Sequence, residues 1–202
     1  MPPHNPDQCL PLTLILNAED DPADTARARL VAAGAVLSRV HTADAREQPS
    51  LFSLDRVHSL AAALEALPAC RLVVIDPVTA YFPDGRDSHK QTDVRRVLAP
   101  LADLAQRRAV TILLVAHLNK DAMAPEVYRV SGSTALPAAC RAVWSVWRDP
   151  DDPELRLFKP IKLNLARDGG VRRYRLAETQ TPEGTPKIVW EAGGGGGGGG
   201  GR

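Results

Sequence analysis

Short apolar runs alternate with stretches of helical periodicity over most of the chain. This pattern predicts four buried strands, at residues 13–17, 72–76, 111–117 and 142–147. Strands that alternate with helices are typical of parallel βαβ units, and near-continuous apolar strands fit a sheet that is covered on both faces. We therefore predict an α/β fold in which these four strands run parallel.

Helices are expected between the strands. The stretch ADTARARLVAAGA should end near Gly34, and Ser53 has the position of an N-cap for LDRVHSLAAALEAL. Ser88 and Gln91 have the spacing of a capping box in front of an apolar stripe, and Pro100 should kink that helix. The segment SGSTALPAAC is expected to form a short helical turn.

The pattern changes after Arg148. The short runs LFKPIKLNL, VRRYRL and KIVW, separated by DGG and TPEGTP turns, predict an antiparallel meander at the edge of the sheet. Glycine occupies every position from 193 to 201, and such a tail cannot build a core. We expect an irregular N-terminus at 1–11, one domain at 12–192 and a disordered tail at 193–202.

Composition fits a single globular domain that is not embedded in a membrane. The 202 residues are 44% hydrophobic, and no signal peptide or apolar run of roughly 18 residues is present. Cys9, Cys70 and Cys140 form no metal or redox pattern, and the last two should be buried thiols, which fits a reducing cytoplasm. The region 141–175 holds 9 basic and 5 acidic residues, so it can face phosphates or be an ordinary solvated surface.

Carboxylates follow the first two predicted strands. Asp76 ends an apolar run, which is where phosphate-transfer ATPases place the aspartate that holds magnesium, although a carboxylate before Pro77 can also cap a turn. Glu19 follows the first strand and can activate a water molecule, while Asp20 or Asp21 can cap the next helix. Both interpretations of this acidic cluster can hold together.

His117 closes the third predicted strand. A polar residue at this place can sense a γ-phosphate, although a histidine at a strand end is often structural. Three strands then end in polar groups at one edge, and ligands of open α/β sheets bind at the carboxyl edge. Farther on, Arg141, Lys162 and Asn164 lie in the basic region, where a basic residue can stabilise phosphoryl charge in a neighbour's site or form a surface ion pair.

The ordered segments AEDDP, FSLD, LVVIDP, DSHKQTDVRRVLAPL, HLNK, YRVSGSTA and KxN resemble the RecA-like ATPases related to plasmid RepA replicative helicases. These belong to the AAA ATPases in the broad sense, and the resemblance covers about residues 12–176. It implies a RecA-like sheet, ATP and Mg²⁺ as cofactors, single-stranded DNA as a partner, and a homo-oligomeric ring.

The resemblance also implies a role for individual residues. It places the catalytic base on Glu19, the Walker B magnesium residue on Asp76 and the phosphate sensor on His117. An arginine finger acting in trans falls on Arg141. The later KxN or KxR element, which contacts the nucleotide, falls on Lys162 and Asn164, where Asn164 replaces a basic residue of some relatives. Lys120 and Arg129, in a loop that faces the ring's channel, are implied to contact single-stranded DNA through its phosphates.

The sequence departs from this family in one respect. No GxxxxGK[ST] phosphate loop is present in the 202 residues, so the backbone cradle and the lysine that bind phosphates have no counterpart. The family's central strand precedes that loop and lies between the strands that correspond to 111–117 and 142–147. We therefore expect a partial RecA-like domain with two unpaired strand edges and no ATP hydrolysis of its own.

Two other hypotheses remain open. The chain can be a degenerate ATPase module that acts in oligomerisation or partner binding without turnover. It can also be an unrelated α/β protein whose acidic strand ends are structural. A reading frame that continues upstream of Met1 into GxxxxGK[ST] would favour the enzyme over the degenerate module.

Overall fold

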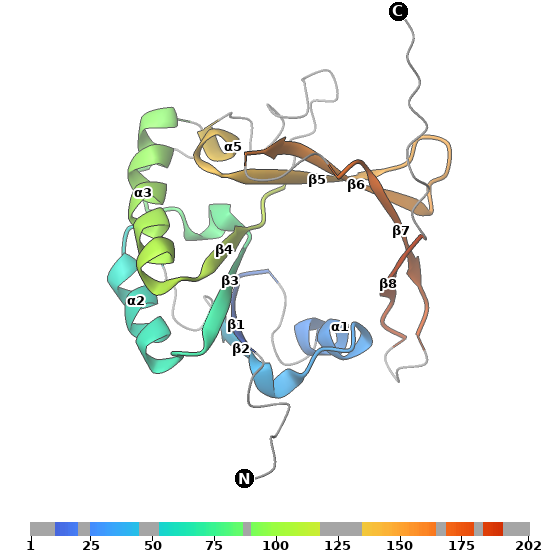
Figure 1. Cartoon of the computed structure of the whole chain (residues 1–202), viewed down its shortest axis with the longest axis horizontal. Helices are drawn as coiled ribbons and strands as arrows, with labels where there is room; N and C mark the ends of the chain where they lie inside the picture. Colours follow the sequence, from blue (N-terminus) through green and yellow to red (C-terminus); the bar gives the residue numbers. More distant parts are fainter. Residues whose placement is uncertain are drawn as a thin grey trace, which may run out of the picture.

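The computed structural model describes residues 11–19, 25–44, 53–86, 90–117, 135–164, 169–179 and 184–191. These residues form two four-stranded sheets with flanking helices (Figure 1). The first sheet is built from β1 (Leu12–Asn17), β2 (Val40–Asp44), β3 (Cys70–Asp76) and β4 (Thr111–Leu114). The second is built from β5 (Ala142–Arg148), β6 (Leu155–Leu163), β7 (Arg172–Ala177) and β8 (Lys187–Trp190).

The first sheet is parallel, with the strand order β2-β1-β3-β4. Helices α2 (Val57–Ala66) and α3 (Gln91–Arg108) lie on one side of it, and α1 (Arg27–Ala32) lies on the other (Figure 1). This division follows from right-handed crossovers, because the chain moves one way along the sheet from β1 to β2 and the opposite way afterwards. The strand order and the helical layers confirm the predicted α/β class.

The core lies between this sheet and the helices α2 and α3. Alternate side chains of β1 and β3 point into it, and Val73 and Ile75 are fully buried. The helices contribute the apolar stripes that their periodicity predicts, namely Leu60, Leu64, Val94, Val97, Leu98, Leu101 and Leu104. Helix α1, by contrast, contains no buried residue, so the opposite face of the sheet is only partly covered.

The helix ends differ in part from the sequence prediction. Gly34 has a φ of 76° just after α1, as a helix-terminating glycine should. Ser53 is not an N-cap: α2 begins at Val57, and the backbone N–H of Arg56 donates to the Ser53 carbonyl in a turn. Helix α3 begins at Gln91 with Lys90 at the N-cap, so Gln91 does not have the place that the predicted capping box requires; Ser88 lies outside the described residues. The helix continues through Pro100. The short helix α5 (Ala135–Ala139) is present as expected.

The prediction that residues 142–147 form a strand of the parallel sheet was wrong. The segment is a strand, but it pairs antiparallel with β6 rather than joining the parallel sheet. The meander β6–β7–β8 is confirmed as antiparallel, and it forms a sheet of its own with β5. Alternation of exposed and buried side chains suits an antiparallel strand, because one face can remain open to solvent.

The third predicted strand is shorter and more exposed than expected. β4 ends at Leu114, and the Leu113 side chain is 43% exposed. Within the described residues β4 pairs only with β3, and β5 pairs only with β6, so each strand ends its sheet. Exposure on β4 follows from this edge position.

Candidate functional site

The carboxyl edge of the parallel sheet collects the polar residues that follow β1, β3 and β4. Asn17 and Asp76 are partners in the register of β1 and β3, and the Ala18 N–H donates to the Asp76 carbonyl at 3.0 Å. The Val115 N–H donates to the Ile75 carbonyl at 2.9 Å, which holds the segment after β4 beside the end of β3. Parallel pairing therefore brings Glu19, Asp76 and the segment ending at His117 to one edge.

Glu19 and His117 are in direct contact. The Nε2 atom of His117 lies 3.1 Å from Oε1 and 3.3 Å from Oε2 of Glu19, although 98 residues separate them in the sequence. The His117 side chain is 67% exposed and the Glu19 side chain is 53% exposed. A contact so open to water contributes little to the stability of the fold.

Asn17 fixes the backbone from which Glu19 projects. Asn17 is 6% exposed, and its Oδ1 atom accepts a hydrogen bond of 2.9 Å from the Glu19 N–H. Such a bond between an Asn side chain and the backbone N–H two residues later is an Asx-type turn. Asn17 was not among the predicted site residues, although an amide that ends an apolar strand just before acidic residues was a usable signal.

A second strand end at this edge was also missed. β2 lies on the outer side of β1, and its last residue, Asp44, is in register with Asn17. The segment VHTAD has only two aliphatic residues and gives no strong strand signal. Its place in the sheet follows from pairing with β1, which the local pattern does not reveal.

Lys162 lies in β6 and Asn164 directly follows that strand, near Arg141. The Arg141 carbonyl accepts a hydrogen bond of 3.1 Å from the Asn164 N–H, which joins the start of β5 to the end of β6. Lys162 donates from Nζ to the carbonyls of Pro137, Ala138 and Cys140 at 3.1, 3.1 and 2.7 Å. The ammonium thus caps the C-terminal end of α5, where carbonyl groups lack partners within the helix.

This capping role leads to a stability prediction. Replacing Lys162 by methionine should lower the free energy of unfolding by about 1–3 kcal/mol, because three carbonyls lose a charged donor. Lys90→Met is the matched control, since the Lys90 side chain is exposed and makes no capping hydrogen bond to α3. Urea unfolding followed by circular dichroism measures both variants, and equal stabilities would contradict the capping role.

Cys140 lies beside this cap as a free thiol. Burial raises the pKa of Cys140, and the neighbouring Lys162 charge opposes that rise only in part. The thiol therefore remains protonated near neutral pH and is a poor nucleophile. Cys70 is fully buried, as predicted, whereas Cys140 is only half-buried.

The remaining predicted site residues have no described position. Lys120 and Arg129 lie outside the described residues, as do Asp20 and Asp21. Within the described part of the chain, no three or more His, Cys, Asp or Glu side chains gather to hold a metal ion. In the same part, no helix has the length and apolar character needed to cross a membrane.

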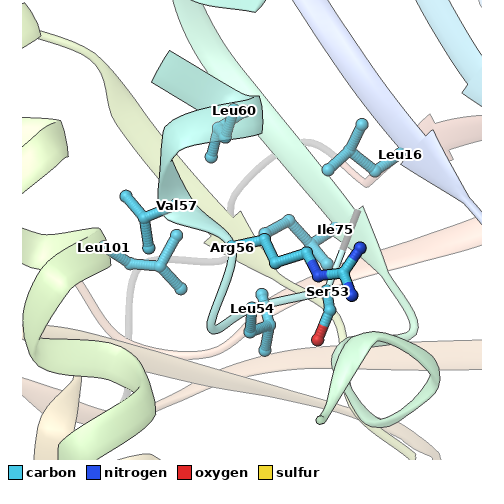
Figure 2. A pocket seen from close by; sticks show the side chains of 8 residues that line it. All are labelled: Leu16, Ser53, Leu54, Arg56, Val57, Leu60, Ile75 and Leu101. Carbon is cyan, nitrogen blue, oxygen red and sulfur yellow. The ribbon is translucent and has the colours of Figure 1, made fainter. Parts of the chain in front are cut away.

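The hollow drawn in Figure 2 is not a ligand site. It lies between the sheet and the helices, lined by Leu16, Ser53, Leu54, Arg56, Val57, Leu60, Ile75 and Leu101 (Figure 2). Its volume of about 10 Å³ is near the lower limit for one water molecule. It is a packing gap in the core, and a nucleotide cannot enter it.

Comparisons with known proteins assign the chain to a family. A family model described as an AAA domain matches residues 9–123, which is more than half of the chain. The chain therefore belongs to the AAA domain family. No curated protein matches it.

Solved structures establish the fold as RecA-like. A structure described as an ATPase domain aligns with a TM-score of 0.65 at 11% identity, over 82% of this chain and 71% of that one. The RadB recombinase aligns with a TM-score of 0.58 at 18% identity, over 89% of this chain and 79% of that one. A DnaB-like replicative helicase, in a structure that also concerns its interactions with primase, gives 0.67 at 11% identity and 89% coverage. The alignment spans about half of that helicase chain (51%).

Proposed function

We propose that residues 12–117 supply the hydrolytic edge of a RecA-like ATPase site of the helicase or recombinase type. The observation that carries the proposal is the contact between Glu19 and His117 at the strand edge that also holds Asp76. The AAA domain match and the RecA-like neighbours support it. The site collects groups that act on water and on a divalent cation.

In this proposal each side chain has a separate task. The Glu19 carboxylate orients a water molecule and accepts its proton at a side-chain oxygen. His117 holds that carboxylate through Nε2, and it is placed to respond when a phosphate competes for the same contact. Asp76 is half-buried and offers oxygen ligands to Mg²⁺. Bound Mg²⁺–ATP supplies the phosphoryl group and the charge neutralisation at this edge.

The described residues include a carboxylate that suits Mg²⁺, but the sequence contains no loop that suits the phosphates of ATP. Mg²⁺ is usually held by one or two carboxylates together with water and phosphate oxygens, so Asp76 is a sufficient protein ligand. Phosphates need a cradle of backbone N–H groups and a lysine, and no GxxxxGK[ST] occurs in these 202 residues. Further parts of the proposal are a helicase-type ring, contact with single-stranded DNA through Lys120 and Arg129, an arginine finger acting in trans at Arg141, and contact with the nucleotide by Lys162 and Asn164.

The chain as it stands is expected to show no measurable ATP hydrolysis, since nothing in its sequence replaces the phosphate cradle. The measurement is phosphate release by the purified 202-residue protein with Mg²⁺ and ATP, compared with its Glu19→Gln variant. Titration calorimetry should likewise show weak or no ATP binding. Magnesium-dependent turnover that disappears in the variant would refute this expectation and would instead support the catalytic role of Glu19.

The absent loop also favours a second candidate function. A degenerate ATPase module can keep the fold and its surfaces while it acts in oligomerisation or partner binding. The two functions differ in the effect of restoring a phosphate loop. A form extended through an upstream reading frame that encodes GxxxxGK[ST] should hydrolyse ATP if the site is catalytic, and should remain inactive if it is degenerate.

A further inference from the structure

The outer strand of the antiparallel sheet has an open edge that carries apolar side chains. All four residues of β8 are exposed, and Ile188, Val189 and Trp190 are 51%, 44% and 49% exposed. In the described part of the chain, β8 pairs on one side only, with β7. An edge strand of this kind is a template for pairing with another strand, and proteins usually place charged side chains on such edges to prevent that pairing.

The backbone groups on the open edge belong to Ile188 and Trp190. The Glu191 N–H donates to the Arg173 carbonyl at 2.9 Å, and Val189 is in register with Arg175. Hydrogen-bonded pairs alternate with non-hydrogen-bonded pairs in an antiparallel ladder. The residues at 187, 189 and 191 therefore direct their N–H and C=O groups toward β7, and those at 188 and 190 direct theirs outward.

The sequence KIVWE at 187–191 is complementary to itself. When two copies pair antiparallel about Val189, Lys187 of each copy faces Glu191 of the other, and Ile188 faces Trp190. Opposite charges and apolar pairs that face each other directly stabilise a sheet. The outward N–H and C=O groups also match, because Ile188 and Trp190 then form the hydrogen-bonded pairs and Val189 lies on the two-fold axis.

Neighbouring registers are less favourable. A shift of two residues in one direction places Pro186 opposite Trp190, and proline has no N–H to donate at that position. The shift in the other direction places Val189 opposite Glu191 and removes the pairing of opposite charges. Of these three registers, only the one centred on Val189 pairs Lys187 with Glu191 and also pairs the outward backbone groups of Ile188 and Trp190.

We propose that β8 is a dimerisation strand, and that its partner is β8 of a second copy of this chain in an antiparallel, two-fold arrangement. The interface is isologous, so each copy contributes the same segment. The strand is held ready for pairing, because the Trp190 ring packs against Tyr174 and Phe158 with centroid distances of 5.2 and 5.9 Å. Pairing joins the antiparallel sheet β5–β8 of one copy to the same sheet of the second copy, so that the two form one continuous sheet.

This dimer is expected to be reversible. Five residues on each side form a much smaller contact than the roughly 20–30 residues per side of a standard interface. Oppositely charged pairs at both ends of the strand set the register more than they add affinity. The dimer fraction should therefore rise with protein concentration and fall at high salt.

Charge reversal tests the proposed register. In sedimentation velocity over a concentration series, the wild-type protein should show a reversible dimer, and Lys187→Glu should raise the dissociation constant at least tenfold. Glu191→Lys should do the same, although it also removes a 3.3 Å ion pair with Arg175. An equimolar mixture of the two variants restores both opposite-charge pairs and should regain dimers. Wild-type protein that stays monomeric, single variants that dimerise normally, or a mixture that stays monomeric would each overturn the proposal.

Cross-linking provides an independent test. A non-hydrogen-bonded pair has its Cα atoms about 4.5 Å apart, which is within the range that a disulfide spans. Val189→Cys should therefore give a covalent dimer under mild oxidation, whereas Val31→Cys, with 45% exposure on α1, should not. The wild-type protein controls for the three native cysteines. Cross-linking of Val189→Cys at the level of either control would overturn the proposal.

Discussion

Replacing Ile75 by alanine is expected to lower the free energy of unfolding by about 2–5 kcal/mol. Ile75 is fully buried in the middle of the core, between the parallel sheet and helices α2 and α3. The truncation removes buried apolar atoms and leaves a cavity that close-packed neighbours fill only in part. Because Ile75 immediately precedes Asp76, the same change should also loosen the carboxyl edge of β3.

The matched control for Ile75→Ala is Leu113→Ala on the neighbouring strand. Leu113 is 43% exposed at the sheet edge, so its truncation should cost less than about 1 kcal/mol. Thermal or urea unfolding of both variants, analysed with a common denaturant slope, gives the comparison. Equal losses of stability at the two positions would contradict the assignment of the core to the α2–α3 side of the sheet.

Replacing Glu19 by glutamine should have the largest effect on chemistry. In a form of the protein that contains a phosphate-binding loop, we expect the turnover number to fall by about 10²–10⁴-fold, the usual contribution of a general base. Glutamine keeps the shape of the side chain and an acceptor oxygen for His117, but it cannot take a proton from water. Because Glu19 is 53% exposed, the substitution should leave the stability of the fold nearly unchanged.

The sequence was a good guide to the helical side of the parallel sheet. The apolar residues of α2 and α3 recur with helical spacing, and these same residues are the ones buried against the sheet. β1 and β3 are recognisable as apolar strands because they lie inside the sheet. The meeting of Glu19 and His117 was also predictable in outline. Residues 98 positions apart come together because parallel strands share one carboxyl edge.

Other features depend on long-range choices that a local pattern does not contain. The local pattern of AVWSVWR predicts a strand but does not say whether that strand is parallel or antiparallel. Its direction is decided by its partner β6, with which it pairs antiparallel. Strand β2 is visible through its pairing with β1 rather than through its own residues. The helix starts were misjudged for a related reason, since the N–H of Leu54 donates to the Tyr81 carbonyl and this contact occupies the segment where the N-cap was expected.

The dimerisation proposed for the antiparallel sheet does not depend on ATP. Lys162 joins β6 to the end of α5. Arg175 of β7 donates a 2.6 Å hydrogen bond to Asp152, in the turn before β6, and this hydrogen bond lowers the pKa of Asp152. These contacts order the sheet whose outer strand is proposed to pair. An oligomer assembled through β8 would therefore persist when the ATPase site is incomplete.

The most direct test of the central claim is the turnover number for ATP of the loop-containing form, measured beside its Glu19→Gln and Glu154→Gln variants. Glu154 is exposed in the turn before β6, so Glu154→Gln controls for the loss of a surface carboxylate. We predict magnesium-dependent hydrolysis that falls at least about 10²-fold in Glu19→Gln and is unchanged in Glu154→Gln. Equal turnover by the Glu19→Gln variant and the unmodified protein would contradict the assignment of the hydrolytic edge to Glu19, Asp76 and His117.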